Sequence, residues 1–449
     1  KVEFFKGNLR EANMSGADLT GANLGRASLV NTNLVRATLT GAYLYGTRLV
    51  EADLSEVNLV GVRLSGADLT GANLRGADLG GVDLNRIGGY LGKNFIEIKE
   101  NANYRGVTSF DLSGDIHYLT TRSGILYELK NEELTIGLDL RNNPRFTTEE
   151  SELGLMSVAS NNGLIYISYT IRGDDIYQYY LVVDEYSKTF EKIRTILRVG
   201  TPTDDHHAGT LIFDRHGRLY VSVGDGGNKG DPERYAQDLN SLKGKILRFD
   251  VSRTNLEPEI VAYGLRNPWK ISIDSKNRMF VGDCGWNTVE SVYLIDDLYP
   301  TTPYNLGWPV FEGTERISEG GHPPFNKGDP LMLHNILAPI YEYRHYTGVG
   351  ICVIGGFFLD GPEVYLFGDV LGNLRLLKEQ QDGKWREIYS QQTETDIWSF
   401  GYDQKTKKLY TSGSKSFELT IPSEQINFLP QVTLCRTTMP NGTINNSDC

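Results

Sequence analysis

The sequence lacks any run of 18 apolar residues, so no transmembrane helix is expected. It also lacks an excess of basic residues, because 45 Lys and Arg stand against 57 Asp and Glu, a formal net charge of -12. Proteins that bind nucleic acid nonspecifically, or anionic membranes, rely on clustered Lys and Arg. We therefore expect neither partner, and a neutral or cationic small molecule is favoured. At 449 residues the chain has room for two or three domains.

The chain begins with Lys1 rather than Met and shows no signal peptide, so we expect a processed or trimmed product. Of the 4 cysteines, Cys284 and Cys352 lie in core-like contexts, whereas Cys435 and Cys449 flank a polar tail. A Cys435–Cys449 disulfide would suit an oxidising compartment, and two free thiols in a disordered tail fit the sequence equally well.

The same tail carries glycosylation sequons at Asn441 and Asn445. Sequons of this kind are glycosylated in secreted proteins. We accordingly expect a secreted glycoprotein, in an extracytoplasmic or surface-exposed location.

An apolar residue recurs every five positions from Leu9 to Leu84, and a small residue usually stands two positions before it. A period of five matches neither the 3.6 residues of a helical turn nor the alternation of a strand. It predicts a coil that turns a corner every five residues, with the large and the small side chain inside. Stacked coils would share backbone hydrogen bonds, as strands do in a ladder.

This stretch, with Ser-Gly-Ala-Asp-Leu-Thr-Gly-Ala-Asn-Leu at residues 65–74, resembles the pentapeptide-repeat family. The resemblance covers residues 4–85 and implies a right-handed quadrilateral β-helix of about four coils. Some members imitate DNA with an acidic surface, but residues 1–90 hold nine basic and nine acidic residues, which removes that interpretation. A spacer, docking or stacking role is favoured, including self-association through the open ends of the coil.

After Gly88 and Gly89 the five-residue pattern stops, and short alternating or apolar runs follow, each bounded by Gly, Asp or Asn. Examples are residues 115–120, 164–169, 218–223 and 278–282. Strands repeated at this density over more than 300 residues predict a β-propeller. We therefore predict an all-β chain with a β-helix at 1–88, a six-bladed propeller at 89–425 and a polar tail at 426–449.

Two residues of the propeller segment have the chemistry of a catalytic pair. His206 lies just before a predicted strand, and Asp225 lies in the Gly-Asp-Gly-Gly turn that follows the next one. In a propeller, loops at one end converge on the axis, so the Asp225 carboxylate can hold an imidazole tautomer and leave the other nitrogen as a base. The alternative is structural, with Asp225 as an ordinary turn residue and His206 as a hydrogen-bonding side chain.

Several segments in order resemble the soluble pyrroloquinoline quinone (PQQ)-dependent sugar dehydrogenases and the related hedgehog-interacting-protein-like proteins. They include residues 206–209, 219–227, 244–250, 263–269, 282–287, 305–309 and 339–343. The resemblance covers residues 100–415 and implies a six-bladed propeller that oxidises the anomeric carbon of an aldose or a glycan end.

The resemblance also implies roles for individual residues. His206 would be the base, Asp225 its orienting group, and Arg266 the cation that stabilises the reduced cofactor. The PQQ-binding residues would be His206, Arg266, Asn267, Cys284, Gly285 and Trp286. Calcium would be bound by the backbone carbonyls of Gly285, Trp286 and Leu306 and by the carboxylate of Glu290, since hard oxygen ligands suit this ion.

The sequence departs from the family where the cofactor's carboxylates would need cations. The lysine that pairs with the cofactor's carboxylates in the family would fall near Leu371, and the family's later arginine pair is missing near residues 397–400. The segment at residues 149–154 contains three glutamates. A trianionic ligand needs cationic partners once it is desolvated. Three functions therefore compete: a PQQ- and calcium-dependent oxidoreductase, a propeller that binds a glycan or protein without turnover, and a structural assembly protein of a fibre or surface layer.

Overall fold

The computed structural model describes residues 2–78 except 65, 70 and 71; 96–100; 106–317 except 131–132, 149–151, 174–175 and 229; 336–345; 352–420 except 381, 394, 404 and 407; and two short strands at 437–438 and 444–445. The described residues are almost entirely β-structure, with one 3-10 turn at η3 (Leu140–Asn142). None of them forms a helix long and apolar enough to cross a membrane.

The described residues between 2 and 78 form a regular coil whose successive turns are joined by parallel bridges between residues twenty apart, such as Asn8↔Ser28 and Asn33↔Asp53. Twenty residues are four pentapeptides, which agrees with a four-sided coil. The large residues of the five-residue pattern are inside, because Leu24, Leu29 and Leu34 are fully buried. The small residues Ala22, Ala27 and Ala42 are fully buried as well. The five-residue period therefore reports the core of the coil.

The polar positions of the repeat shape its corners. At the corners the backbone has positive φ, for example 67° at Gly16, 64° at Gly21 and 56° at Asn31. Asn or Asp side chains two residues before a corner N–H accept a hydrogen bond from it, as Asp18 does from Thr20 at 3.0 Å. Gly tolerates positive φ, and Asn and Asp form such local bonds readily, so the motif favours these residues for a physical reason.

The rest of the described chain forms six larger sheets. In the first sheet the strands are β2 (Val107–Asp111), β3 (His117–Thr121), β4 (Ile125–Lys130) and β5 (Glu133–Asp139). In the second they are β6 (Leu155–Asn161), β7 (Leu164–Arg172), β8 (Tyr179–Tyr186) and β9 (Lys192–Thr201). In the third they are β10 (Ala208–Phe213), β11 (Leu219–Val223), β12 (Lys245–Phe249) and β13 (Glu259–Tyr263), with β17 (Tyr304–Asn305) added in parallel.

In the fourth sheet the strands are β14 (Pro268–Ile273), β15 (Met279–Asp283), β16 (Val289–Ile295) and β20 (Tyr341–Arg344). In the fifth they are β21 (Val353–Leu359), β22 (Val364–Asp369), β23 (Asn373–Glu379) and β24 (Trp385–Gln392). In the sixth they are β25 (Ser399–Tyr402), β26 (Leu409–Ser412), β27 (Ser416–Thr420) and β1 (Glu97–Glu100). A small hairpin joins β18 (Phe311–Glu312) and β19 (Glu315–Arg316).

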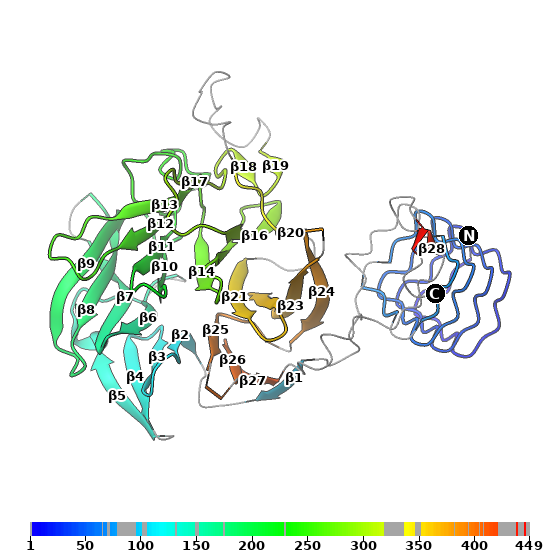
Figure 1. Cartoon of the computed structure of the whole chain (residues 1–449), viewed down its shortest axis with the longest axis horizontal. Coiled ribbons are helices and arrows are strands. Elements are labelled where there is room, and N and C mark those ends of the chain that lie inside the picture. The colour runs from blue at the N-terminus through cyan, green and yellow to red at the C-terminus, as the bar shows by residue number, and fades with distance from the viewer. Residues whose placement is uncertain are drawn as a thin grey trace, which may run out of the picture. The chain divides into compact units, whose positions relative to one another are not determined.

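The six sheets are the blades of a propeller, as predicted. The innermost strands β2, β6, β10, β14, β21 and β25 contact one another in sequence, and β25 contacts β2 again (Figure 1). The ring closes within the sixth blade, where β1 from the start of the propeller segment lies next to β27 from its end. A blade made from both ends of the segment removes the open edge that an incomplete blade would present.

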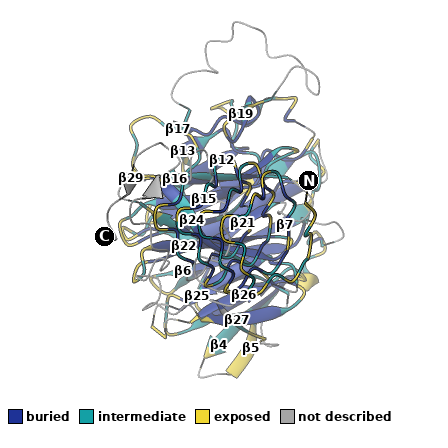
Figure 2. Ribbon diagram, turned by 90° about the vertical axis from the view of Figure 1, so that its right-hand side faces the viewer, coloured by how far each residue is buried: buried dark blue, intermediate teal, exposed yellow. Residues whose placement is uncertain are grey.

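The interior of the propeller is formed by the alternating and apolar runs seen in the sequence. The run predicted at 218–223 is β11, all five residues of which are buried, and the run at 278–282 is β15. Each follows a turn held by an aspartate: Asp214 accepts hydrogen bonds from the backbone of His216 and Arg218. Burial falls toward the outer strands, and β5 is largely exposed (Figure 2).

A disulfide joins Cys284, directly after β15, to Cys352, directly before β21. It therefore links the fourth blade to the fifth at the ends of two strands. The sequence placed both cysteines in core-like contexts, but it did not indicate that they pair.

The predicted domain limits at residues 88 and 425 lie outside the described residues, as do Cys435, Cys449 and Asn441, so these remain predictions. Within the tail, β28 (Thr437–Thr438) pairs with β29 (Ile444–Asn445) in antiparallel fashion, and Asn445 of the second sequon lies in this pair. Self-association of the coil also remains a prediction.

The coil core can be tested by removing one interior side chain. Leu44 is fully buried, so Leu44→Ala should destabilise the coil by about 2–5 kcal/mol. The neighbouring Tyr45 is 49% exposed, and Tyr45→Ala should cost less than about 1 kcal/mol. Urea unfolding followed by far-UV circular dichroism compares the two. Equal midpoints for both variants would contradict the interior assignment of Leu44.

The disulfide should stabilise the propeller because it closes a long loop. The two cysteines are 68 residues apart, for which loop-closure entropy gives about 4 kcal/mol. We expect the double variant Cys284→Ala, Cys352→Ala to lower the urea midpoint of tryptophan fluorescence, which reports on the propeller because all 5 tryptophans lie there. Dithiothreitol should lower the wild-type midpoint by a similar amount and leave that of the double variant unchanged. Equal midpoints for wild type and variant without reductant would argue against the bond.

Candidate functional site

The centre of the candidate site is a pair formed by His206 and Asp225. His206 lies two residues before β10 and Asp225 two residues after β11, and these antiparallel strands bring the two side chains together. His206 Nδ1 and Asp225 Oδ1 are 2.6 Å apart. The Asp225 side chain is completely buried, whereas 11% of the His206 side chain is exposed. The pair therefore has the geometry that the sequence predicted, with the imidazole on the accessible side.

The charge of Asp225 fixes the chemistry of the imidazole. An ionised carboxylate only accepts hydrogen bonds, so Nδ1 donates and the neutral ring carries its lone pair on Nε2. Burial opposes the charged imidazole, but the carboxylate of Asp225 and its hydrogen bond outweigh burial, and the pKa of His206 is raised above its ordinary value. His206 is thus a stronger base than a free imidazole.

The backbone packs closely around the His206–Asp225 pair. A Cβ on Gly224 would lie 2.0 Å from the carbonyl oxygen of His206, so only glycine fits at this position. His206 itself has a φ of 55°, a conformation that non-glycine residues adopt rarely and chiefly at functional sites. Its backbone N–H donates to the carboxylate of Glu152 at 2.7 Å.

Asp225 also connects His206 to the arginine that the sequence singled out. Its second oxygen, Oδ2, accepts a hydrogen bond from Trp308 Nε1 at 2.9 Å, and its backbone N–H donates to the carbonyl of Arg266 at 2.8 Å. The Arg266 guanidinium lies over the Trp308 ring, 5.7 Å from its centroid. Trp308 therefore contacts two of the three predicted catalytic residues, Asp225 and Arg266.

Arg266 and Asn267 precede β14 and are held by a buried carboxylate. Asp283 accepts hydrogen bonds from both backbone N–H groups, at 3.1 Å and 2.8 Å. Burial raises the pKa of Asp283 to about 7. The Asn267 side chain donates to Glu152 at 3.2 Å. His206 and Asn267 are thus both attached to Glu152, a residue for which the sequence indicated only local acidity.

The residues predicted to bind calcium are engaged by other groups. Glu290 accepts hydrogen bonds from His345 Nε2 at 2.5 Å and from the backbone of Gly285, Cys352 and Val353. The carbonyl of Gly285 accepts from Arg266 Nη1 at 2.7 Å. The carbonyl of Leu306 accepts from the Tyr293 hydroxyl at 3.3 Å.

The backbone at Trp286 is held by the carboxylate of Glu312. Its backbone N–H, and those of Asn287, Thr288 and Val289, donate to Glu312 Oε1. Cys284 contributes only its carbonyl, which accepts from Arg266 at 3.1 Å, because its sulfur is bonded to Cys352. The described residues contain no group of three or more His, Cys, Asp or Glu side chains that could bind a metal ion. Three of the four predicted calcium ligands, the carbonyls of Gly285 and Leu306 and the carboxylate of Glu290, thus already accept hydrogen bonds, one of them from a guanidinium, and in this arrangement they do not fit calcium.

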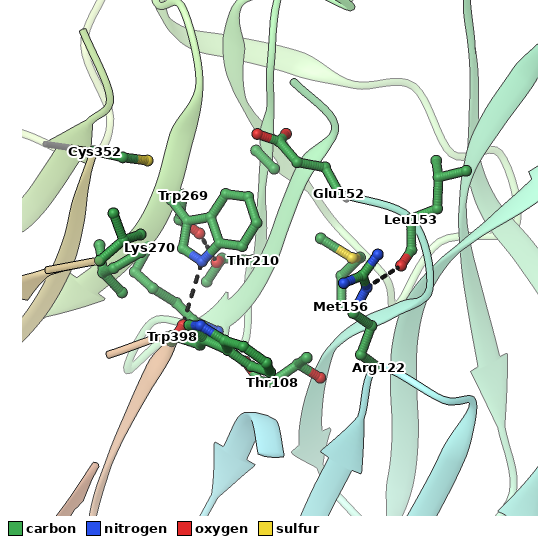
Figure 3. A pocket seen from close by; sticks show the side chains of 13 residues that line it. Thr108, Arg122, Glu152, Leu153, Met156, Thr210, Trp269, Lys270, Cys352 and Trp398 are labelled. Carbon is green, nitrogen blue, oxygen red and sulfur yellow. Dashed lines mark hydrogen bonds between the residues drawn. The ribbon is translucent and has the colours of Figure 1, made fainter. Parts of the chain in front are cut away.

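A cavity of about 330 Å³ lies among the inner strands of the propeller, and Glu152, the acceptor of the His206 N–H, is on its wall (Figure 3). It is lined from all six blades by Thr108, Arg122, Glu152, Leu153, Met156, Ala208, Thr210, Trp269, Lys270, Cys352, Ile354, Val370 and Trp398. Figure 3 shows Glu152 and the two tryptophans facing it. Burial lowers the pKa of Arg122 and raises that of Glu152.

The structure thus brings four predicted residues together, namely His206, Asp225, Arg266 and Asn267, and adds Trp308 and Glu152. Their catalytic and cofactor-binding roles remain predictions. Of the residues missed, Glu152 lies in the acidic segment at 149–154 that the sequence singled out. No sequence pattern pointed to Arg122 or Lys270, because they come to line the same cavity only when the six blades close into a ring.

Comparisons with known proteins agree with this architecture. Residues 110–332 match the family model of glucose / sorbosone dehydrogenases, and residues 12–49 and 47–86 match that of pentapeptide repeats. Among curated relatives, the HIPL1 protein of Arabidopsis thaliana is 32% identical over 40% of this chain and 31% of its own length. The aldose sugar dehydrogenase YliI of Escherichia coli is 28% identical over 32% of this chain and 42% of its own length. The human hedgehog-interacting protein is 28% identical over 27% of this chain and 23% of its own length.

The chain therefore spans less than half the length of these relatives. Solved structures extend the likeness of fold over 72% of the chain. A putative glucose dehydrogenase of a Thermus species superimposes with a TM-score of 0.55 at 19% identity, and all of that chain is covered. The PQQ-bound aldose sugar dehydrogenase of Streptomyces coelicolor does so with a TM-score of 0.53 at 18% identity, and 97% of that chain is covered. The protein joins pentapeptide repeats to a six-bladed propeller of the sugar dehydrogenase-like type.

Proposed function

We propose that the propeller is an oxidoreductase that acts on the anomeric hydroxyl of an aldose or of a glycan end, with His206 as the base. The observation that carries this proposal is the 2.6 Å hydrogen bond between His206 Nδ1 and the buried Asp225 carboxylate. It leaves Nε2 on the accessible side with its lone pair free to take a proton. A base–carboxylate pair of this kind is the usual arrangement for removing a hydroxyl proton near neutral pH.

Arg266 supplies the positive charge of the proposed site. Loss of a hydride from the sugar carbon needs an acceptor on whose oxygens negative charge develops, and a fixed guanidinium stabilises that charge. Buried Arg266 Nε and Asn267 Oδ1 have no hydrogen-bond partner in the described part of the chain. An unpaired donor beside the base fits a quinone oxygen, and the chemistry that PQQ supplies when bound is hydride acceptance.

Calcium takes no part in the proposed mechanism. The Gly285 carbonyl and the Glu290 carboxylate already accept hydrogen bonds, from Arg266 and from four donors respectively. An ion that needs six to eight oxygen ligands would have to displace these partners.

A second candidate function is recognition of a glycan or a protein without turnover. The observation that favours it is Glu152, a buried carboxylate on the wall of the central cavity, where a cofactor with three carboxylates would meet electrostatic repulsion. The relatives named HIPL1 protein and hedgehog-interacting protein point the same way. A role of the coil in a structural assembly is a third proposal, carried only by its regular stacking.

We further infer an extracytoplasmic or surface-exposed location. The support is the Cys284–Cys352 bond, because structural disulfides persist in oxidising compartments.

The catalytic proposal is tested by titrating the purified protein with PQQ and then assaying dye reduction with a panel of aldoses. We expect saturable binding that is unchanged by a calcium chelator. His206→Ala should lower kcat by about 10²–10⁴, the usual contribution of a general base. His216, an exposed turn histidine, provides the matched control, and His216→Ala should keep the wild-type rate. Absence of binding at high micromolar PQQ would retire the oxidoreductase and leave recognition as the function.

The pH profile tests the role of Asp225. The base must be neutral to accept a proton, so kcat/KM should rise with pH through the pKa of His206, which lies above its ordinary value. Asp225→Asn removes the anion that favours the protonated imidazole. The variant should therefore be slower, with its acid limb displaced to lower pH. If the acid limb of the kcat/KM profile has the same midpoint in Asp225→Asn as in the wild type, the group that titrates is not His206.

A further inference from the structure

Lys270 has a position in the propeller that neither the proposed oxidation nor the packing of the blades explains. It is the third residue of β14, on the innermost ring of strands. Its side chain lines the central cavity of about 330 Å³ and also a second cavity of about 450 Å³, which is bordered by the opposite ends of the inner strands. Lys270 therefore lies between two cavities.

The ammonium group of Lys270 has almost no polar surroundings. Nζ donates one hydrogen bond, to the carbonyl of Thr108 at 2.8 Å, and no ion pair to it occurs among the described residues. The central cavity beside it is walled by Trp269, Trp398 and Ile354. A cation in such a place loses its hydration without gaining a counter-ion, which favours the neutral amine.

The charged groups around the two cavities do not supply that counter-ion. Arg122 and Glu152 line the central cavity with Lys270. The second cavity is lined by the charged residues Asp111, Arg215, Asp274 and Asp360. Burial alone lowers the pKa of Lys270, to about 7. Near neutral pH, a larger fraction of Lys270 than of an ordinary lysine therefore carries a free amine beside a cavity.

We propose that Lys270 is a nucleophilic amine that forms an imine with short hydroxyaldehydes, such as the open-chain form of a small sugar, admitted to the central cavity. The lone pair of Nζ forms a bond to the carbonyl carbon, and the carbonyl π electrons pass to oxygen, which takes up a proton while nitrogen loses one. The resulting carbinolamine eliminates water to give the C=N bond. The step consumes no oxidant or reductant, and desolvated lysines in apolar pockets are the usual amines for it.

The cavity matches this class of ligand. Trp269 and Trp398 offer aromatic faces to the C–H groups of a polyhydroxy chain, and the hydroxyls of Thr108 and Thr210 lie on the same wall. The volume of about 330 Å³ suits a molecule of a few carbon atoms.

Lys245 provides an internal control. It is fully buried, and burial lowers its pKa to about 7 as well. Its Nζ, however, donates to the carbonyls of Tyr235, Ala236 and Lys243, and it lines neither cavity. A lowered pKa without access to a cavity should not produce imine formation.

The test is trapping with glycolaldehyde and sodium cyanoborohydride on the wild-type protein, without quinone, followed by peptide mass spectrometry. At pH 7 we expect Lys270 to be modified at least about tenfold faster than the exposed Lys276 and Lys405, which form ion pairs at the surface. Lys245 should remain unmodified. As the pH rises from 6 to 8, the rate at Lys270 should rise and then level off, because burial lowers the pKa of its amine to about 7.

Modification of Lys270 no faster than that of Lys276, or equal modification of Lys245, would overturn the proposal. No variant is needed, because each lysine is read separately in the same spectrum. His206→Ala protein should be labelled at Lys270 like the wild type, so the imine and the oxidoreductase proposals fail independently of each other.

Discussion

Backbone hydrogen bonding at strand edges is the constraint on which the structure depends. A strand edge left open would expose a row of unpaired N–H and C=O groups. In the coil, each turn pairs with the turn twenty residues further on. In the propeller, each blade is a separate sheet, and the sixth is completed by β1. The two solutions need different sequences, which is why a five-residue period gives way to short alternating runs.

Closure of the propeller is also what creates the site. Glu152, His206 and Asn267 lie in loops ahead of three different inner strands, β6, β10 and β14. Glu152 accepts hydrogen bonds from the other two. Asp225 is the central acceptor of this arrangement, since it receives His206, Trp308 and the backbone of Gly227. A carboxylate with three donors is held rigidly, and a rigid carboxylate keeps the imidazole in one tautomer.

Much of this could be predicted from the sequence, because the signals are local or periodic. The coil follows from one large and one small residue in every five, and the propeller from strands bounded by Asp and Gly turns. His206 and Asp225 could be paired because two adjacent antiparallel strands connect them. The Cys284–Cys352 bond could not, since it spans 68 residues, and the sequence suggested only Cys435 and Cys449 as a pair.

The engaged calcium ligands illustrate a different limit. The family resemblance assigned Gly285 and Glu290 to the calcium site from the sequence alone. Whether their oxygens are free depends on hydrogen bonding in the folded chain, and the donors, Arg266 and His345, come from other segments. The same holds for Lys270, whose environment consists of residues from six blades. The sequence shows which potential ligand atoms are present. The folded structure is needed to show which of them already accept hydrogen bonds.

The pairing of β1 with β27 has a consequence for synthesis of the chain. During translation β1 emerges more than 300 residues before its partner. The coil, whose contacts span twenty residues, can fold as soon as it leaves the ribosome, whereas the propeller ring stays open until its last strand appears. The nascent chain thus carries an unpaired edge through most of the synthesis of the propeller, and the sixth blade is completed only after β27 has emerged.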